Sequence, residues 1–268
     1  MKITVITVCF NEEKNIKKTV ESVLSQTSSD FEYIICDGNS ADKTVEIARS
    51  YGAAFAEKGV SYTVNSEPDK GIYDGMNKGI SLATGDYIYF LNAGDWFYSD
   101  DIIERAVNAA SDNSVPDFLY GDVAMVERGV VTVSVGDDSA LTEGMSISHQ
   151  AVFSSTSLMK QNNFKLEYKI AADYDFLLSQ KLQDKTFFNI NSIVAYFATD
   201  GLSTQNLDKC IAEQSKIKKN YGIEFDEKRA IKNAKKIARI VKIKGLIPQW
   251  LWQFWSVKIR GKTLFADK

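Results

Sequence analysis

The chain has 268 residues, of which 44% are hydrophobic and 25% are charged, and its formal net charge at pH 7 is -3. This is the composition of an ordinary soluble protein, long enough to bury a substantial core in one α/β domain with extensions. The three cysteines, Cys9, Cys36 and Cys210, are too few and too irregularly spaced for a disulfide framework or a zinc site. Their small and odd number favours a protein that resides in a reducing compartment.

The charge is unevenly distributed along the chain. Residues 1–208 hold 16 Lys/Arg against 30 Asp/Glu, whereas residues 209–268 hold 16 against 5, so the two parts are expected to meet different partners. The amino-terminal segment MKITVITVCF carries one charge and passes directly into a strand pattern, which is unlike a secretory signal. No run of about 18 apolar residues is present to span a bilayer.

The first half of the chain alternates strand patterns with helix patterns. Residues 2–10 are a continuous β-branched run, as expected of a strand buried on both faces in a parallel sheet. Further strands are expected at 31–36, 60–66 and 87–91, and helices at 11–24, from Ser40 or Asp42 to Gly52, at 72–83 and at 99–110. This β-α-β-α-β-α-β order predicts a mostly parallel sheet with helices on both faces.

After Pro116 the pattern changes. Residues 118–126 and 130–135 flank a Glu-Arg-Gly turn and predict an antiparallel hairpin on the sheet's edge. A strand at 147–153, a short helix at 154–160, a helix at 172–182 and a strand at 187–197 complete a domain that spans 1–204, and 205–268 form a helical extension. The order of the later strands in the sheet is not readable from the sequence.

Polar clusters follow four of the expected strands, at 7–12, 37–40, 67–69 and 92–95. Ligands of open parallel sheets bind beyond the carboxyl ends of the strands, so these clusters predict a binding site at one edge. Simple capping and turn formation accounts for Asn11, Ser40 and Asp42 at least as well, but it explains Asp95 and the GIYDGMNKG segment poorly. Neither GxGxxG after the first strand nor GxxxxGK[ST] occurs, which argues against a dinucleotide dehydrogenase and a P-loop NTPase.

In combination, six segments resemble the inverting family 2 glycosyltransferases with a GT-A fold, the kind that build bacterial surface polysaccharides: ITVCFNEEKNIKKTVESVLSQ, DGNSADKT, EPDKGIYDGMNKG, FLNAGDWF, SHQAVF and AADYDF. The resemblance runs from residue 2 to about residue 200. It implies a Rossmann-like sheet with a nucleotide-sugar-binding half at 1–115 and an acceptor-binding half at 116–204. It also implies a nucleotide-diphosphate sugar donor, usually a UDP-sugar, and a divalent metal. The expected acceptor is a saccharide, which the C-terminal extension described below predicts to be lipid-linked.

The resemblance also implies the site residues. Thr7, Phe10 and Glu12 would line the nucleoside pocket, and Asp37 would accept a hydrogen bond from the base. The remaining donor-binding candidates lie near the ribose and diphosphate or in the same motifs: Asp69, Lys70, Gly71, Asp74, Asn77, Lys78, Asn92 and His149. His149 is the only histidine, and Lys70 and Lys78 are equally well explained as solvated side chains.

Asn92 and Asp95 stand where the metal motif of the family falls. The sequence departs from that motif, because Asn-Ala-Gly-Asp replaces a pattern of three carboxylates and leaves only Asp95 as a carboxylate ligand. Mn²⁺ or Mg²⁺ with water and both phosphates can still complete six oxygen positions. The affinity for the metal without donor is therefore expected to be weak.

Asp173 matches the position of the family's catalytic base, although the Glu that often precedes it is Ala172 here. A single in-line displacement would invert the anomeric centre, so an α-linked donor would give a β-linked product. Two alternatives stay open: Asp173 is an acid favoured by the N-terminal end of its helix, or Asp175 is the base and Asp173 is structural.

The extension combines an apolar stripe, a cationic face and clustered tryptophans. The stripe consists of Ala230, Ile231, Ala234, Ile237, Ala238 and Val241; the opposite face carries Lys228, Arg229, Lys232, Lys235, Lys236, Arg239 and Lys242. Trp250, Leu251, Trp252, Phe254 and Trp255 follow, flanked by Lys258, Arg260 and Lys262. This pattern predicts that 228–262 bind an anionic membrane surface, peripherally, on the cytoplasmic face of the cell membrane.

The alternatives for the extension are packing on its own catalytic domain or pairing with a second copy as a homodimer. Nucleic acid is disfavoured as a partner because the acidic first part would oppose it. For the whole chain, the alternatives to a metal-dependent glycosyltransferase are a sugar nucleotidyltransferase and a noncatalytic nucleotide-binding protein. The first of these would need a Gly-rich basic loop after the first strand, which Cys9-Phe10-Asn11-Glu12 does not supply.

Overall fold

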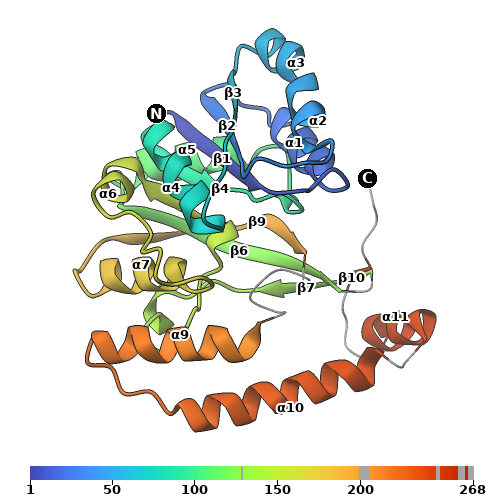
Figure 1. Ribbon diagram of the computed structural model, residues 1–268, viewed down its shortest axis with the longest axis vertical. Coiled ribbons are helices and arrows are strands. Elements are labelled where there is room, and N and C mark those ends of the chain that lie inside the picture. The colour runs from blue at the N-terminus through green and yellow to red at the C-terminus, as the bar shows by residue number, and fades with distance from the viewer. Residues whose placement is uncertain (128, 199–205, 246–247, 259–262, 265–268) are drawn as a thin grey trace.

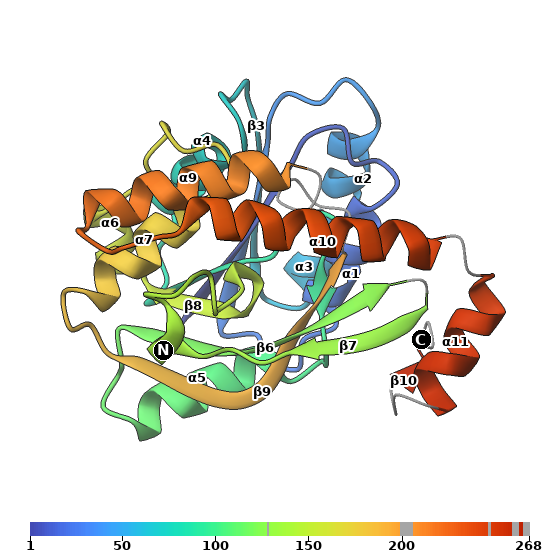
Figure 2. The same cartoon turned by 90° about the horizontal axis from the view of Figure 1, so that it is seen from below.

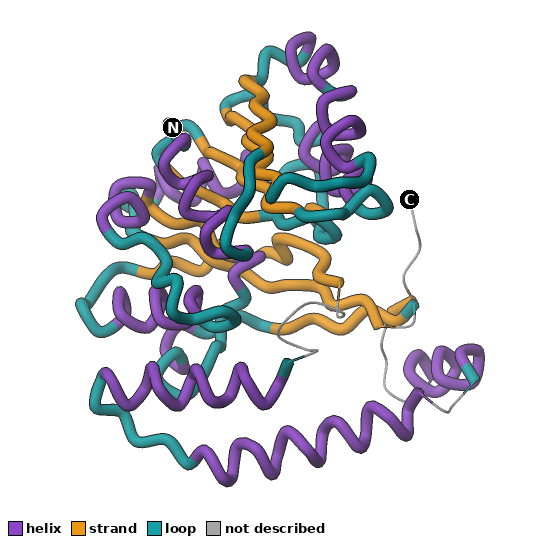
Figure 3. Tube along the Cα trace, viewed as in Figure 1, coloured by secondary structure: helices purple, strands orange, loops and turns teal. Residues whose placement is uncertain are grey.

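A computed structural model of the chain describes residues 1–127, 129–198, 206–245, 248–258 and 263–264. A mixed sheet with helices on both faces forms the body of the molecule, and two long C-terminal helices lie across one end of it (Figures 1 and 3). The α/β architecture of strand and helix expected from the sequence is confirmed.

The parallel half of the sheet comes from the first 90 residues. β1 (Ile3–Cys9) lies between β2 (Phe31–Asp37) and β4 (Tyr87–Phe90), and β3 (Ser61–Ser66) pairs with the outer side of β2. All residues of β1, β2 and β4 are buried, which explains their unbroken apolar runs. The connecting helices are α1 (Ile16–Leu24), α2 (Thr44–Ser50), α3 (Gly52–Glu57) and α4 (Ile72–Leu82).

The second half of the sheet is mixed. β8 (Val152–Ser155) is antiparallel to both β4 and β6 (Phe118–Glu127), and β7 (Val130–Ser134) is antiparallel to β6. β9 (Phe187–Ala198) runs parallel to β6 and also pairs with the short β5 (Trp96–Phe97), whereas β10 (Thr263–Leu264) pairs with β7. The predicted hairpin is present, but β6 lies inside the sheet and not at its edge, because β8 and β9 flank it.

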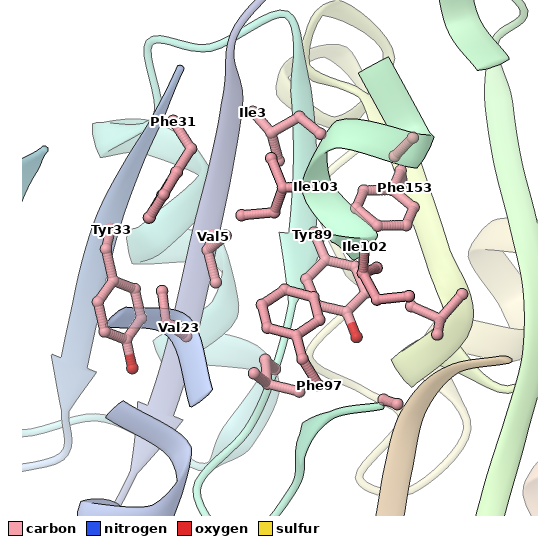
Figure 4. Packing of buried hydrophobic residues seen from close by; sticks show 14 of the residues in the cluster. Ile3, Val5, Val23, Phe31, Tyr33, Tyr89, Phe97, Ile102, Ile103 and Phe153 are labelled. Atoms are coloured by element: carbon pink, nitrogen blue, oxygen red, sulfur yellow. The ribbon is translucent and has the colours of Figure 1, made fainter. Parts of the chain in front are cut away.

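The core forms two layers, one on each face of the sheet. Alternate residues of β1 point to opposite faces, so Ile3 and Val5 pack with α1, α3 and α5 (Ile102–Asp112), as Figure 4 shows for part of this layer. Ile6 and Val8 pack on the other face with α4, α6 (Thr156–Gln161) and α7 (Ala172–Lys181). The carboxyl ends of β1 and β4 emerge between these layers.

The extension folds into α9 (Leu207–Asn220), α10 (Glu227–Gly245) and α11 (Gln249–Lys258). α10 runs back beside α9 in both views (Figures 1 and 2). Of the predicted apolar stripe, Ala230 and Ile231 are half-buried and Ala234 is buried; the side chains of Ile237, Ala238 and Val241 lie outside the described part. The start of the stripe therefore packs within the extension, beside α9.

The cationic face of α10 is exposed where it is described, at Lys228, Arg229, Lys232, Lys235 and Lys236. Trp252 is only 2% exposed, whereas the side chains of Trp250, Phe254 and Trp255 lie outside the described part, as do Arg239, Lys242, Lys258, Arg260 and Lys262. Within the described residues, none of the helices has both the length and the apolarity needed to cross a membrane.

Candidate active site

A cavity of about 990 Å³ lies beyond the carboxyl ends of β1 and β4. Eight of the residues predicted from the sequence line it: Phe10, Glu12, Asp69, Gly71, Asn92, Asp95, His149 and Asp173. These residues come from five separate segments, and the sheet brings them together. α9 closes one side of the cavity with Cys210 and Gln214.

Thr7 does not line the cavity. Its side chain is fully buried on the face of β1 that α1 covers, and its hydroxyl donates to the Leu91 carbonyl at 2.6 Å and lies 2.9 Å from the Tyr33 hydroxyl. Thr7 therefore connects β1 to its two neighbouring strands, and its side chain is not part of the cavity wall.

Asp37 also lies behind the cavity wall, and it is 3% exposed. Its Oδ2 accepts from the Ser40 amide at 2.9 Å and from the Ser66 hydroxyl at 2.7 Å, and the Ser40 hydroxyl donates to its Oδ1. The carboxylate thus ties the loop after β2 to the end of β3. In the described arrangement this role already uses most of its acceptor capacity.

Three predicted residues on α4 form structural contacts outside the cavity. Asp74 accepts from the Lys70 amide at 3.0 Å, and the Asn77 side chain exchanges two hydrogen bonds of 2.9 Å with the backbone of Phe164. Lys78 donates to the Pro68 carbonyl at 2.7 Å and pairs with Glu67. The side chain of Lys70 is exposed and does not line the cavity.

Asp69 reaches the cavity through a gap between two glycines. A Cβ at Gly38 would lie 2.7 Å from Asp69 Oδ2, and a Cβ at Gly75 would lie 3.3 Å from the same atom. The Asp69 Oδ1 accepts from the Gly71 amide at 2.9 Å, which holds the carboxylate beside the start of α4. A side chain at Gly38 would therefore displace the Asp69 carboxylate, whereas one at Gly75 would meet Val8 first, at 2.7 Å.

Asp173 is at the centre of a hydrogen-bonded cluster in the cavity. Its Oδ2 accepts from His149 Nδ1 at 3.1 Å, and its Oδ1 lies 2.9 Å from the Tyr73 hydroxyl. His149 Nε2 lies 3.2 Å from Asn92 Nδ2. The side chain of Asp173 is 14% exposed and that of His149 is 24% exposed, so both remain accessible from the cavity.

The cluster has defined protonation preferences. Burial opposes the charged form of His149, but the hydrogen bond and the charge of Asp173, with a further contribution from Asp95, outweigh it and raise the pKa of His149. Burial and the charge of Asp173 raise the pKa of Tyr73 well above its usual value, so the phenol is a neutral donor. In either state of His149, a proton on Nδ1 can be donated to Asp173.

Asp175, the alternative base, points away from the cavity. It is 3% exposed and its Oδ2 pairs with Lys165 Nζ at 2.9 Å. Asp173 and Asp175 are two residues apart on α7, which places them on different sides of the helix. Of the two carboxylates, only Asp173 lines the cavity.

Asp95 is 5% exposed and is held from two sides. Its Oδ2 accepts from Gln150 Nε2 at 3.2 Å, and its backbone carbonyl accepts from the Thr19 hydroxyl at 2.8 Å. Nearby, Asn92 Oδ1 is buried and has no hydrogen-bond partner among the described residues. A buried amide oxygen without a partner is costly, so a ligand that approaches it would be stabilised.

The cavity does not contain a complete metal site of protein ligands. Among the described residues, no three His, Cys, Asp or Glu side chains gather as a metal site would require. Asp95 and the unpartnered Asn92 Oδ1 are nevertheless oxygen donors of the type that Mg²⁺ and Mn²⁺ prefer. These two donors fit a cation whose remaining ligands come from a bound diphosphate and water.

Several residues that line or support the cavity were not predicted from the sequence. In the sequence, Tyr73 looks like part of the apolar face of a helix, yet in the structure its hydroxyl lies 2.9 Å from Asp173 Oδ1. Gln150, which orients Asp95, is adjacent to the predicted His149, and this position was the available signal. Cys210 and Gln214 lie four residues apart on α9, and nothing in their local sequence indicates a site.

Comparison with known proteins identifies the family. The family model "Glycosyl transferase family 2" matches residues 4–133. A PGL/p-HBAD biosynthesis glycosyltransferase of Mycobacterium tuberculosis is 29% identical over 210 residues, which cover 77% of this chain and 80% of that protein. An uncharacterized glycosyltransferase of the same organism is 32% identical over 208 residues, covering 75% of this chain and 77% of that protein.

Solved structures share the fold. Staphylococcus aureus TarS 1–349 in complex with UDP-GlcNAc is 18% identical, with a TM-score of 0.66 over 86% of this chain and 69% of that chain. A longer TarS chain matches over only 41% of its length. The mannosyltransferase PcManGT from Pyrobaculum calidifontis, in complex with GDP-Man and Mn²⁺, is 15% identical, with a TM-score of 0.62 over 96% of this chain and 79% of that chain. Together, the sheet with its cavity, the family match and these relatives show that the chain belongs to glycosyltransferase family 2 and has a GT-A fold.

Proposed function

We propose that the protein transfers a sugar from a UDP-sugar to a hydroxyl group of a saccharide acceptor, with inversion, in the synthesis of a cell-surface glycan. The observation that supports this most directly is the presence of Asp173 and the Asn92–Asp95 segment in the wall of one cavity. A base and a site for a leaving diphosphate must face the same sugar, and this cavity can accommodate both.

The donor would bind at the ends of β1 and β4. Asp69 and Gly71 would contact the ribose and diphosphate, and Phe10, which is 59% exposed, offers an aromatic face to the base. UDP as the nucleotide is supported by the TarS structure with UDP-GlcNAc, which has the same fold. Glu12 would complete the nucleoside pocket. Asp37 would reach the base only after its contacts with Ser40 and Ser66 rearranged.

Asp95 and Asn92 Oδ1 would hold a Mn²⁺ or Mg²⁺ ion together with the two phosphates. Such an ion stabilises the negative charge that develops on a leaving nucleoside diphosphate. On the protein side, Gln150 fixes the carboxylate of Asp95, and Thr19 fixes its backbone. The PcManGT structure with Mn²⁺ supports a metal in this fold.

Asp173 would act as the general base. The acceptor hydroxyl oxygen attacks the anomeric carbon, the bond from that carbon to the diphosphate oxygen breaks, and the hydroxyl proton passes to the Asp173 carboxylate. Tyr73 and His149 each donate a hydrogen bond to this carboxylate, which fixes its orientation while leaving one side open to the cavity. A single displacement of this kind inverts the anomeric centre.

The extension and the relatives support a proposal for the acceptor and the cellular location. We propose a lipid-linked saccharide acceptor and peripheral attachment to the cytoplasmic face of the membrane through the exposed lysines and arginine of α10. The name of the mycobacterial relative, a PGL/p-HBAD biosynthesis glycosyltransferase, supports a role in making a surface glycan. A homodimer formed through the C-terminal helices is the alternative use of this surface.

Binding and turnover of nucleotide sugars test the proposed reaction. Thermal unfolding would be measured with UDP-GlcNAc, UDP-Glc, UDP-Gal and GDP-Man, each with and without Mn²⁺, and release of UDP or GDP would be followed in the same mixtures. We expect a UDP-sugar to stabilise the protein more in the presence of Mn²⁺ and to release UDP slowly. Absence of both stabilisation and release with every sugar would refute the proposal.

Sedimentation with liposomes tests the proposed attachment. Vesicles with about one third anionic lipid should bind the protein at low salt and release it at high salt, because exposed cations are screened. Replacing Lys228, Lys232, Lys235 and Lys236 by Glu should abolish binding without changing UDP release. If this variant still bound the vesicles, the role of the cationic face would be contradicted. If the parent protein instead formed a dimer at low and high salt, and the variant did not, the homodimer would be favoured.

A further inference from the structure

α9 forms part of the cavity wall and is more than a connection to the rest of the extension. It lies outside residues 4–133, which match the family model, yet Cys210 and Gln214 on one side of the helix line the cavity. Between these two residues, Glu213 is directed at the segment 169–171, which leads into α7 and Asp173. The contact joins the extension to the residues that precede the base.

The carboxylate of Glu213 accepts hydrogen bonds from three consecutive backbone amides. Oε1 accepts from the Lys169 amide at 2.8 Å, and Oε2 accepts from the amides of Ile170 and Ala171, each at 2.9 Å. Hydrogen bonds to an ionised carboxylate are roughly twice as strong as neutral ones. Three of them on adjacent residues fix the backbone of this segment in one conformation.

This segment sets the position of Asp173. Ala171 is the N-cap of α7, and its carbonyl accepts the hydrogen bond from the Asp175 amide, so the start of the helix depends on its backbone. The Ile170 carbonyl lies 2.7 Å from the Tyr73 hydroxyl, and the same hydroxyl lies 2.9 Å from Asp173 Oδ1. Glu213 therefore restrains the base through the helix start, and it also places the Ile170 carbonyl beside Asp173 Oδ1, where both accept from the single proton of the Tyr73 hydroxyl.

We propose that Glu213 is a positioning residue, whose contacts with the amides of residues 169–171 hold Asp173 in the orientation that deprotonates the acceptor. The inference rests on the proposed role of Asp173 as the base. It gives the first helix of the extension a direct part in the transfer reaction: α9 closes the cavity and also fixes the group that acts in it. A displacement of a catalytic group by about 1 Å can cost on the order of 100-fold in rate.

The test compares Glu213→Gln with Glu167→Gln. A glutamine side chain has one oxygen, which can accept, and one NH₂ group, which can only donate. It therefore loses at least one of the three hydrogen bonds and places its NH₂ group against a backbone N–H group. Glu167 provides a matched control, because it pairs with Lys216 across the same interface, but both of these side chains are about half exposed and neither contacts the backbone amides. Glu213→Asp keeps the charge with a shorter reach.

Three measurements are made on each full-length variant: UDP affinity, the rate of UDP release from the UDP-sugar that the parent protein uses, and hydrogen exchange of the amides of 169–171. For Glu213→Gln we expect exchange at least about 10-fold faster at these amides and turnover reduced about 10- to 100-fold, with the affinity for UDP within about twofold. Glu167→Gln should match the parent in all three. Should Glu213→Gln fail to fold, Glu213→Asp is expected to show the same pattern to a smaller extent.

Unchanged turnover in Glu213→Gln with accelerated exchange would overturn the proposal, because the segment would then move without effect on the base. Equal losses of UDP affinity and turnover would also overturn it, since they indicate general disruption. Failure of the proposed function looks different: neither the parent nor Asp173→Asn would release UDP. Unchanged exchange at 169–171 in Glu213→Gln would then refute the positioning contact independently of activity.

Discussion

Two carboxylates on α7, Asp173 and Asp175, should respond to the same substitution in opposite ways. The cavity-facing Asp173 is 14% exposed and accepts hydrogen bonds from His149 and Tyr73. The side chain of Asp175 is 4% exposed and pairs with Lys165 behind the cavity wall. Replacing each by Asn removes one negative charge at almost the same point of the chain, so the pair separates catalysis from folding.

For Asp173→Asn the expected loss is in turnover. A positioned base contributes about 10²- to 10⁴-fold, which corresponds to about 3 to 5 kcal/mol of activation free energy. The amide oxygen can still accept from the Tyr73 hydroxyl, but the NH₂ group cannot accept from His149 Nδ1. Loss of that one contact should lower the free energy of unfolding by only about 1 kcal/mol.

For Asp175→Asn the expected loss is in stability. The carboxylate is nearly buried and its partner Lys165 has a side chain that is 52% exposed, so the cation can turn to water when its partner loses charge. The cost should therefore fall below the 3 to 5 kcal/mol typical of a fully buried pair, at about 1 to 3 kcal/mol. In a chain of this size that lowers the melting temperature by about 2 to 10 °C.

UDP release and thermal unfolding of both variants check these values, with UDP affinity measured in parallel to show that the donor still binds. Asp173→Asn should be inactive and nearly as stable as the parent, whereas Asp175→Asn should be less stable and active below its unfolding temperature. The reverse pattern would refute the assignment of the base. Near-normal turnover in both variants would show that neither carboxylate takes the proton.

Three further predictions concern single groups. Asp173→Asn should lower the pKa of His149, because the hydrogen bond and the charge that raise this pKa disappear. His149 is the single histidine of the sequence, so NMR titration measures its pKa directly. An unchanged pKa would contradict the contact between His149 and Asp173. Burial would raise the pKa of the Glu32 carboxylate, but four hydrogen bonds to it lower that pKa to about 2. The ionised carboxylate should therefore stabilise the folded protein by about 3 kcal/mol above about pH 4.5, and this contribution should disappear toward pH 2. In urea unfolding, Glu32→Gln should lower the free energy of unfolding by this amount at pH 7 and have little effect at pH 2. Gly38→Ala should displace the Asp69 carboxylate and weaken UDP binding by about 10-fold in calorimetry, and unaltered affinity would remove Asp69 from the donor site.

The strand and helix pattern of the first 115 residues was largely predictable because each signal is local. β1, β2 and β4 carry unbroken apolar runs, and polar turns punctuate them. The order of the later strands was not predictable, because it depends on contacts between distant segments. β8 inserts between β4 and β6, and β9 occupies the other side of β6, which no pattern within 118–126 indicates.

The same distinction explains which of the predicted residues line the cavity. Asn92 and Asp95 follow a strand that ends at the cavity, so their location follows from the topology alone. Thr7 was expected to line the nucleoside pocket, but its side chain is buried away from the cavity. The sequence of a strand that is buried on both faces does not indicate which of its side chains point toward a ligand. The polar and glycine-rich segment 71–79 has structural roles in α4. Asn77 and Lys78 donate hydrogen bonds to neighbouring backbone carbonyls, and Gly75 and Gly79 let the helix approach β1 closely.

The extension shows most clearly what a local pattern leaves out. Its amphipathic sequence predicts a membrane surface, but Glu213 and Lys218 turn α9 toward the catalytic domain, with Lys218 Nζ donating to the Glu143 carbonyl at 2.6 Å. α10 then packs beside α9 and buries Ala234, while its lysines remain exposed. If the cationic face binds a membrane, α9 is the helix that connects it to residues 169–171. Attachment and the orientation of Asp173 would then be linked by one helix, which would place a lipid-linked acceptor and its base in the same rigid unit.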